Sequence, residues 1–381
     1  MGNPLLGVVF HWLGGLASAS FYVPYRGVRR WSWEIFWLTG GIFSWLIAPW
    51  FFASIQTQDL LGVLGAAPSS TVFYCVLFGV LWGFGGLTYG LTMRYLGLSL
   101  GMAVVLGLCT VFGTLIPPIF AGEFGEKLLG TASGRINLVG LAVTVAGIVV
   151  VAMAGARKDA SLTQAQKAAA VTEFDFRRGL LVAIFSGVMS SCYAYGLAAG
   201  EPIRRLSAEA GTGVLWVGLP VICLITFGGL LTNGIWCGWL IVRNRTAGQW
   251  LGRSSVIETS PAGNGTTAST PAPMEPASIQ CAPEDRPGRV PLLRNYLLTA
   301  LGGTLWYFQF FFYTMGESQM GRFGFSSWTL HMASIIIFGT IWGFALREWK
   351  DAAVRTKALV WTGVGLLVLA TLIIGYGNMQ A

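Results

Sequence analysis

Residues 136–156 read INLVGLAVTVAGIVVVAMAGA, and none of these 21 side chains carries a charge. About 20 such residues form a helix that crosses the hydrocarbon core of a bilayer. Backbone amides in lipid must be hydrogen-bonded within their own segment, so this stretch predicts a helix. Nine other stretches without Asp, Glu, Lys or Arg are at least as long, and they are 1–25, 35–58, 60–93, 95–122, 179–200, 210–242, 295–316, 323–346 and 358–381. The sequence therefore predicts an all-α integral membrane protein with ten transmembrane helices.

The composition of the 381-residue chain indicates the same fold class. Charged residues make up 10% of it, against roughly 25% in soluble globular proteins, and hydrophobic residues make up 54%. This is too little charge to cover the surface of soluble domains of that size. Most of the protein surface is therefore predicted to face a lipid bilayer.

The basic residues are distributed unevenly over the connections between the ten stretches. The odd-numbered connections carry 19 Lys and Arg residues, the even-numbered ones carry five, and both tails carry none. Short cytoplasmic connections are enriched in Lys and Arg, so the odd-numbered connections are predicted to be cytoplasmic and both termini extracytoplasmic. The net charge of +8 is thus a topology signal, and we expect no nucleic-acid partner.

Two polar connections divide the chain. Residues 157–178 separate two sets of five stretches, so we expect a first five-helix repeat at 1–156, a cytoplasmic linker at 157–178 and a second repeat at 179–381. Residues 243–294 are rich in Ser, Thr, Pro, Ala and Gly, and they predict a disordered cytoplasmic loop within the second repeat. An odd number of helices per repeat places the repeats in opposite orientations, as in many secondary transporters with a midplane site.

Short echoes between the two halves fix a register for this duplication. Each echo repeats residue types at the same spacing in corresponding stretches. The echoes are Trp82 and Tyr89 with Trp306 and Tyr313, Gly15, Ser18 and Phe21 with Gly187, Ser190 and Tyr193, and Gly113-Thr114 with Gly339-Thr340. Their common order in both halves favours two inverted five-helix repeats.

Ionisable side chains are rare inside the predicted helices. His11 lies near the start of the first stretch and His331 near the start of the ninth, so both are expected at similar depth on the extracytoplasmic side. An intramembrane ionisable residue indicates function by default, and an imidazole is suited to carry a coupling proton. Glu34, at a helix end, is the best additional proton-coupling candidate. The alternatives are a structural histidine bonded to a backbone carbonyl and a solvated glutamate at the interface.

Aromatic and amide side chains share one face of the eighth stretch. Trp306, Gln309 and Tyr313 recur at helical spacing, and Trp82 and Tyr89 are spaced in the same way on the third stretch. Sugars bind to such surfaces, because their C–H faces pack on aromatic rings while fixed polar groups orient the hydroxyls. These five residues are the candidate substrate-binding set, and the alternative is an aromatic-rich face in contact with lipid.

Motifs for other chemistry are missing from the sequence. There is no phosphate-binding loop, HExxH or GxSxG motif, and the six cysteines show no CxxC spacing. We therefore expect no metal site, no cofactor and no enzymatic activity. Transport driven by an ion gradient is the function class that remains.

Several motifs resemble those of one transporter family. The matching segments are the stretch from His11-Trp12 through residues 21–25, RRWSWE at 29–34, YGLTMRYLG at 89–97, LWYFQFFFY at 305–313 and SWTLHM at 327–332. They resemble the L-rhamnose–proton symporter family of the drug/metabolite transporter superfamily. The resemblance implies a ten-helix permease of the bacterial inner membrane that imports L-rhamnose with a proton.

The sequence also departs from the family pattern. Where that pattern reads GNINYG, this chain has Gly86 and Thr88 in place of the two asparagines, and Ala198 stands where the family has an asparagine. Since amides read sugar hydroxyls, the exact sugar stays open. Our hypothesis is alternating-access import of a neutral deoxyhexose. The alternatives are a related permease for another sugar, sugar acid or metabolite, and a membrane-embedded enzyme. Sodium coupling and the choice between monomer and homodimer also stay open.

Overall fold

The computed structural model describes residues 2–96, 98–160, 175–253, 290–321, 324 and 326–380. Most of the predicted linker at 157–178 and of the predicted loop at 243–294 lies outside these residues. Every regular element in the described part is helical, which confirms the all-α fold class. In chain order the elements are α1 (Pro4–Ser20), α2 (Tyr22–Tyr25), α3 (Trp33–Ile42), η1 (Phe43–Ile47), α4 (Ala48–Gln56), α5 (Leu60–Ala66), α6 (Ser69–Leu96), α7 (Leu98–Phe120), η2 (Phe124–Leu129), α8 (Ala132–Ala160), α10 (Phe176–Ala199), α11 (Glu201–Glu209), α12 (Leu219–Asn244), η3 (Ala247–Leu251), α13 (Leu292–Gln319), α14 (Ser326–Ala345) and α15 (Val354–Met379).

Eight helical segments among the described residues are long and apolar enough to cross a membrane. They are Pro4–Tyr25, Trp33–Gln56, Ser69–Thr92, Ala132–Lys158, Phe176–Glu209, Leu219–Asn244, Ser326–Ala345 and Val354–Met379. The other two predicted stretches correspond to α7, whose apolar part is Val104–Phe120, and to α13, which has 28 residues. Helix α13 is more polar because it carries Arg294, Asn295, Gln309 and Glu317. For α7 and α13, the prediction that the helix spans the membrane therefore rests on the sequence alone.

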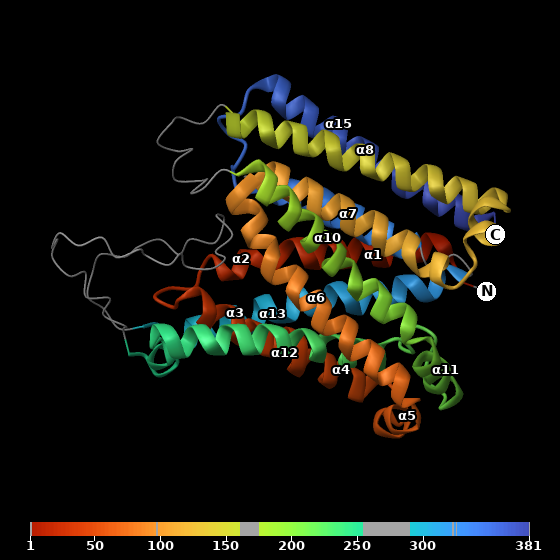
Figure 1. Cartoon of the computed structure of the whole chain (residues 1–381), viewed down its shortest axis with the longest axis horizontal. Coiled ribbons are helices and arrows are strands. Elements are labelled where there is room, and N and C mark those ends of the chain that lie inside the picture. Colours follow the sequence, from red (N-terminus) through yellow and green to blue (C-terminus); the bar gives the residue numbers. More distant parts are fainter. Residues whose placement is uncertain are drawn as a thin grey trace.

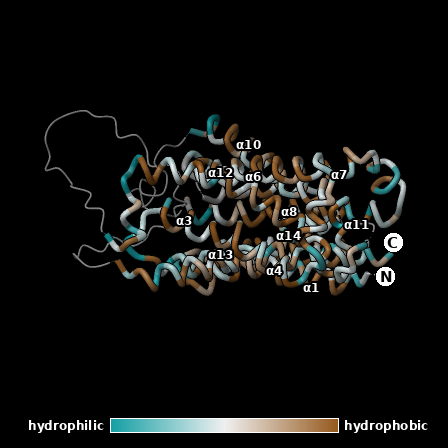
Figure 2. The backbone as a smooth tube through the Cα atoms, turned by 90° about the horizontal axis from the view of Figure 1, so that it is seen from below, coloured by the Kyte–Doolittle hydropathy of each residue, from teal (hydrophilic) through white to brown (hydrophobic). Residues whose placement is uncertain are grey.

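The helices form an elongated bundle and lie mostly along its long axis (Figure 1). Hydrophobic segments dominate its middle, and the most hydrophilic segments gather near its two ends (Figure 2). Both termini lie at the same end. There the Asn3 backbone N–H donates to Gln319 Oε1 at 3.1 Å, and Asn378 Nδ2 donates to Ser326 Oγ at 2.8 Å. These bonds join the start of α1 to the end of α13, and the end of α15 to the start of α14.

Two three-helix units form the centre of the bundle. Helix α1 packs against α13 and α14, and helix α10 packs against α6 and α7. Helices α8 and α15 run side by side along one edge (Figure 1). On the opposite side, α3 and α12 pack against each other and against the central units. The buried polar side chains His11 and Ser18 lie on α1, Gln309 on α13 and His331 on α14.

The predicted stretch 60–93 is divided into two helices. Asp59 caps α5, because its Oδ1 accepts the Gly62 N–H at 3.2 Å. Helix α5 ends before Ala67, which has an extended backbone at φ −66° and ψ 139°. Pro68 follows directly, and the residue before a proline is sterically restrained from helical geometry. The chain therefore turns here before it enters α6.

The segment from Trp33 to Gln56 contains a rarer irregularity. The five residues Phe43–Ile47, element η1, form a π-helical turn between α3 and α4. A π-turn adds a residue to the helical turn and changes which side chains face the neighbours, and such turns are frequent at functional sites. It brings Ser44 and Trp45 into the interior, where both are buried.

Candidate functional site

The two histidines, from opposite ends of the sequence, lie together in the interior. His11 on α1 and His331 on α14 are both 0% exposed, and their ring centroids are 6.4 Å apart. Tyr313 of α13 contacts both rings edge-on, with centroid distances of 5.2 Å to His11 and 5.4 Å to His331. We call these three residues the histidine cluster. The packing of α1 against α13 and α14 brings them together.

None of the four imidazole nitrogens has a hydrogen-bond partner among the residues that the structure describes. Among the described residues, neither imidazole is hydrogen-bonded to a backbone carbonyl, which was the structural alternative for these histidines. Two glycines provide the room for the rings. A Cβ built on Gly316 would lie 2.8 Å from His11 Nε2, and one on Gly14 would lie 3.3 Å from His331 Nδ1.

This geometry limits the charge that the histidine cluster can hold. Two positive charges about 6.4 Å apart repel each other by about 3 kcal/mol at an effective dielectric constant near 20. Burial opposes each charge separately, because the charged form loses its hydration. The pair is therefore expected to carry at most one proton charge at a time.

Gln309 lies one helical turn from Tyr313 on the same helix. It is 5% exposed, and its Oε1 accepts the Ser18 hydroxyl of α1 at 2.9 Å. Its Nε2 has no partner among the described residues. A buried amide donor without a partner costs free energy unless a ligand or water completes its bonds. Gln309 can therefore donate to a bound polar molecule.

Three tryptophans meet next to this amide. Trp82 of α6 and Trp306 of α13 have ring centroids 5.4 Å apart, and Trp45 of η1 lies 6.3 Å from Trp82 and 6.1 Å from Trp306. Trp306 is one turn from Gln309. The structure thus brings together two of the predicted wall residues and adds Trp45, which the sequence analysis missed. Trp45 faces this site because of the π-turn, and a sequence pattern based on the helical period does not predict such a turn.

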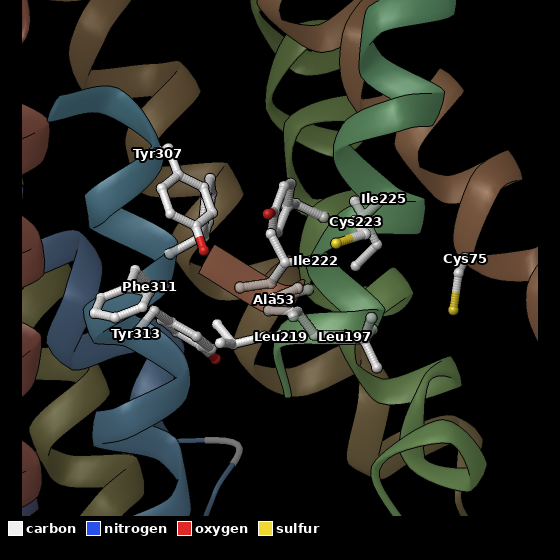
Figure 3. Packing of buried hydrophobic residues seen from close by; sticks show 14 of the residues in the cluster. Ala53, Cys75, Leu197, Leu219, Ile222, Cys223, Ile225, Tyr307, Phe311 and Tyr313 are labelled. Atoms are coloured by element: carbon white, nitrogen blue, oxygen red, sulfur yellow. The ribbon is translucent and has the colours of Figure 1, made fainter. Parts of the chain in front are cut away.

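The other candidate residues lie elsewhere. Tyr89 packs against a small apolar cluster with Leu96, Val105 and Ala183, away from the three tryptophans. Tyr313 belongs to the histidine cluster and also to the large apolar core. In Figure 3, Tyr307 and Tyr313 project from α13 on the side that faces Leu219 and Ile222 of α12.

Glu34 is 6% exposed and lies at the first turn of α3. Its Oε1 accepts Asn244 Nδ2 at 3.1 Å and the Thr246 hydroxyl at 2.9 Å. These bonds tie α3 to the C-terminal end of α12. Its proton-coupling role stays a prediction, and its position is separate from the histidine cluster.

Comparison with known proteins identifies the family. The model of the family described as L-rhamnose-proton symport protein (RhaT) matches residues 1–247 and 285–380. The L-rhamnose-proton symporter of Cronobacter sakazakii is 34% identical over 379 residues, which cover 99% of each chain. That of Mannheimia succiniciproducens is 35% identical over 381 residues, covering 99% of this chain and 98% of the relative. The unmatched residues 248–284 lie within the predicted loop at 243–294. The chain belongs to the L-rhamnose-proton symport protein family.

Proposed function

We propose that this protein imports L-rhamnose together with a proton across the bacterial inner membrane. The family and the names of its relatives support the cargo and the coupling ion. The observation that carries the proposal is a row of side chains that centres on α1 and α13. It runs from three tryptophans, of which Trp45 is buried and the other two are half-buried, through the partly unpaired amide of Gln309 to two histidines whose ring nitrogens have no hydrogen-bond partner among the described residues.

The proposed architecture is ten spanning helices in two inverted five-helix repeats, 1–156 and 179–381. Its support is the pattern of helix pairs. In the repeat register, α1 corresponds to α10, α6 to α13 and α7 to α14. The pair α1–α13 then corresponds to α10–α6, and the pair α1–α14 to α10–α7, and all four pairs are in contact. An inverted repeat predicts this reciprocity.

Individual contacts support the same register. At several positions a glycine of one helix closely approaches one residue of its neighbour, and the corresponding glycine approaches the corresponding residue. The matched contacts are Gly7 with Met320 and Gly179 with Leu96, and Gly15 with Ser334 and Gly187 with Leu108. The sequence echoes define which residues correspond without any use of these contacts, so the contacts are an independent reason for the repeat.

The proposed orientation places both termini outside the cell. The two termini lie at one end of the bundle (Figure 1). The opposite end holds most basic residues near the helix ends, including Arg26, Arg29, Arg243 and Arg347. A cytoplasmic location of that end agrees with the enrichment of Lys and Arg in cytoplasmic connections.

Coupling follows from where the proton binds. In the proposed cycle, one proton from outside binds between His11 and His331, and the sugar binds at the level of Gln309 and Trp306. The two binding places lie close together on α1 and α13. The bound proton and the bound sugar can therefore stabilise the same occluded or inward-facing conformation of the transporter. The coupling can be only as large as the difference in affinity between the two conformations.

The test is uptake of radiolabelled L-rhamnose into proteoliposomes that contain the purified protein. An inward proton gradient should drive accumulation above the external concentration, and a protonophore should remove it. A sodium gradient without a proton gradient should drive none. Absence of uptake in vesicles with folded protein would refute the cargo, and uptake driven by sodium would refute the coupling ion.

A further inference from the structure

One serine is hydrogen-bonded to the backbones of both histidine residues. Ser334 of α14 is 0% exposed, and its hydroxyl donates to the His331 carbonyl at 2.7 Å and to the His11 carbonyl at 2.9 Å. A hydroxyl has one proton to donate, so the two carbonyls share it in a three-centre bond. A serine within a helix commonly donates to a carbonyl of its own helix, three or four residues back. The second acceptor, on α1, makes this bond a connection between the two helices.

Helices α1 and α14 also touch at this serine. A Cβ built on Gly15 would overlap the Ser334 side chain and would lie 2.7 Å from its carbonyl carbon. Each of these two residues lies about one turn from the histidine of its own helix. A second bond between the helices, from Trp342 Nε1 to Ser20 Oγ at 2.9 Å, lies more than two turns from the histidines. Ser334 therefore supplies both a close contact and a hydrogen bond between α1 and α14 next to the two rings.

The corresponding contact in the other three-helix unit lacks this bond. In the proposed register, Gly187 of α10 and Leu108 of α7 take the places of Gly15 and Ser334, and a Cβ on Gly187 would lie 2.7 Å from Leu108 Cβ. A leucine side chain fills the contact without a donor. That unit has an alanine and a valine where α1 and α14 carry histidines. The donor thus occurs in the unit that has imidazoles to position, and close packing of the helices does not require it.

The spacing of the two rings affects how the pair holds a proton. The repulsion between two charges varies inversely with their distance. The ring centroids of His11 and His331 are 6.4 Å apart, and none of the ring nitrogens has a hydrogen-bond partner among the described residues. The positions of the rings therefore depend on packing and on the two backbones that carry them. Ser334 is bonded to both of these backbones.

We propose that Ser334 is a positioning residue, which holds α1 against α14 so that His11 and His331 act as one site for the coupling proton. This inference rests on the proposed function and adds to it a residue that need contact neither the sugar nor the proton. Without the hydroxyl, the two rings can move apart, and each imidazole then binds protons independently of the other. Sugar exchange persists, because Gln309 and Trp306 do not take part in the bond, but a proton gradient drives accumulation less well.

The test uses the two histidines of the chain, which has no others. Protein labelled with ¹³C-histidine and reconstituted into liposomes is measured by magic-angle-spinning NMR, where a long-range cross-peak between two imidazoles reports the proximity of His11 and His331. Liposomes from the same preparation are assayed for L-rhamnose exchange at equal concentrations and for accumulation driven by a proton gradient.

The variant is Ser334→Ala, and the matched control is Ser186→Ala. Ser186 is also 0% exposed, and its hydroxyl donates to the Gly85 carbonyl of another helix at 2.9 Å, in the unit without histidines. We expect the wild type and Ser186→Ala to show the imidazole cross-peak and to accumulate L-rhamnose alike. Ser334→Ala should lose most of the cross-peak and accumulate about 2- to 10-fold less L-rhamnose, the range of one neutral hydrogen bond, with exchange changed by less than about twofold.

Several results would overturn the positioning role. These are absence of the cross-peak in the wild type, a wild-type cross-peak or wild-type accumulation in Ser334→Ala, and equal losses of accumulation in the two serine variants. A loss of exchange as large as the loss of accumulation in Ser334→Ala would show a structural role alone and would also overturn it. Each of these results leaves the proposed function standing if the wild type accumulates L-rhamnose. A folded wild type without proton-driven uptake would overturn the proposed function and the inference together.

Discussion

Two units of this bundle have matching packing and different chemistry. In the proposed register, His11, Tyr313 and His331 on α1, α13 and α14 correspond to Ala183, Tyr89 and Val105 on α10, α6 and α7. The second set belongs to one apolar cluster, and the first is the histidine cluster. A tyrosine occupies the same place in both.

The difference separates packing from function. The apolar unit shows that this helix arrangement forms with alanine and valine, so the fold does not require histidines there. The same holds one turn away, where Ser18 donates to Gln309 in one unit and Ser190 closely approaches Gly85 in the other. We infer that the polar side chains of the first unit are retained for coupling and binding.

The largest effect is expected from making the two units alike. The double substitution His11→Ala with His331→Val should leave folding and sugar exchange at equal concentrations intact. Proton-driven accumulation of L-rhamnose should fall by about 5- to 150-fold, the usual range of a coupling free energy. Exchange and accumulation are measured in the same proteoliposomes. Val105→Ala in the apolar unit is the control, and accumulation by the double variant at the wild-type level would contradict the comparison.

Removing the amide should come next. Gln309→Ala deletes the buried donor and leaves a sugar hydroxyl unpaired, so the dissociation constant for L-rhamnose should rise about 10- to 100-fold. Isothermal titration measures it. In the other unit, the Ser186 hydroxyl donates to the Gly85 carbonyl at 2.9 Å. Ser186→Ala should therefore leave sugar affinity unchanged. An unchanged affinity in Gln309→Ala would remove Gln309 from the site.

A third difference lies one turn beyond Tyr313. Glu317 pairs with Arg204 of α11 at 2.7 Å, with side chains 16% and 17% exposed, whereas the apolar unit has Met93 at the corresponding position. Glu317→Gln leaves the arginine without its partner and should cost about 2 kcal/mol, below the range for fully buried pairs. Thermal unfolding in detergent measures the loss as a lower Tm.

The control for this pair is the exposed one between Arg26 and Glu348, whose side chains are 41% and 42% exposed. Exposed pairs contribute little, so Glu348→Gln should barely change the Tm. Equal Tm changes in Glu317→Gln and Glu348→Gln would show that burial adds nothing to the Arg204–Glu317 pair.

The smallest effect should separate two corresponding serines. Ser18→Ala removes the bond that orients Gln309 and should weaken L-rhamnose binding about threefold. Ser190→Ala has no amide to orient and should have no effect on affinity. Side-by-side titrations of the two variants decide this, and a loss in Ser190→Ala as large as that in Ser18→Ala would remove the distinction.

The sequence predicted the parts of this fold that depend on solvation. Charge-free stretches located the helices because lipid excludes charge over a fixed length. The charge pattern also located α13, although its polar residues make it less hydrophobic than the eight candidate spans. Echoes such as Trp82 and Trp306 gave the register that we propose for the two repeats.

The remaining features depend on local geometry that spacing does not encode. The π-turn that brings Trp45 inward has no helical period, so the position of Trp45 beside Trp82 and Trp306 could not be predicted. The division of the stretch 60–93 into α5 and α6 occurs at Pro68. A proline indicates such a break, but the residues around it are uncharged, so the charge pattern does not show it. The two histidines were expected at similar depth, but their mutual contact depends on how α1, α13 and α14 pack together.

The most direct test of the account is the number of protons taken up with each sugar. Proteoliposomes with an internal pH dye and radiolabelled L-rhamnose give both fluxes in one sample. A histidine pair that holds one proton at a time predicts one proton per L-rhamnose in the wild type and none in the variant with both histidines replaced. Two protons per sugar, or proton uptake that survives the replacement, would contradict the central claim.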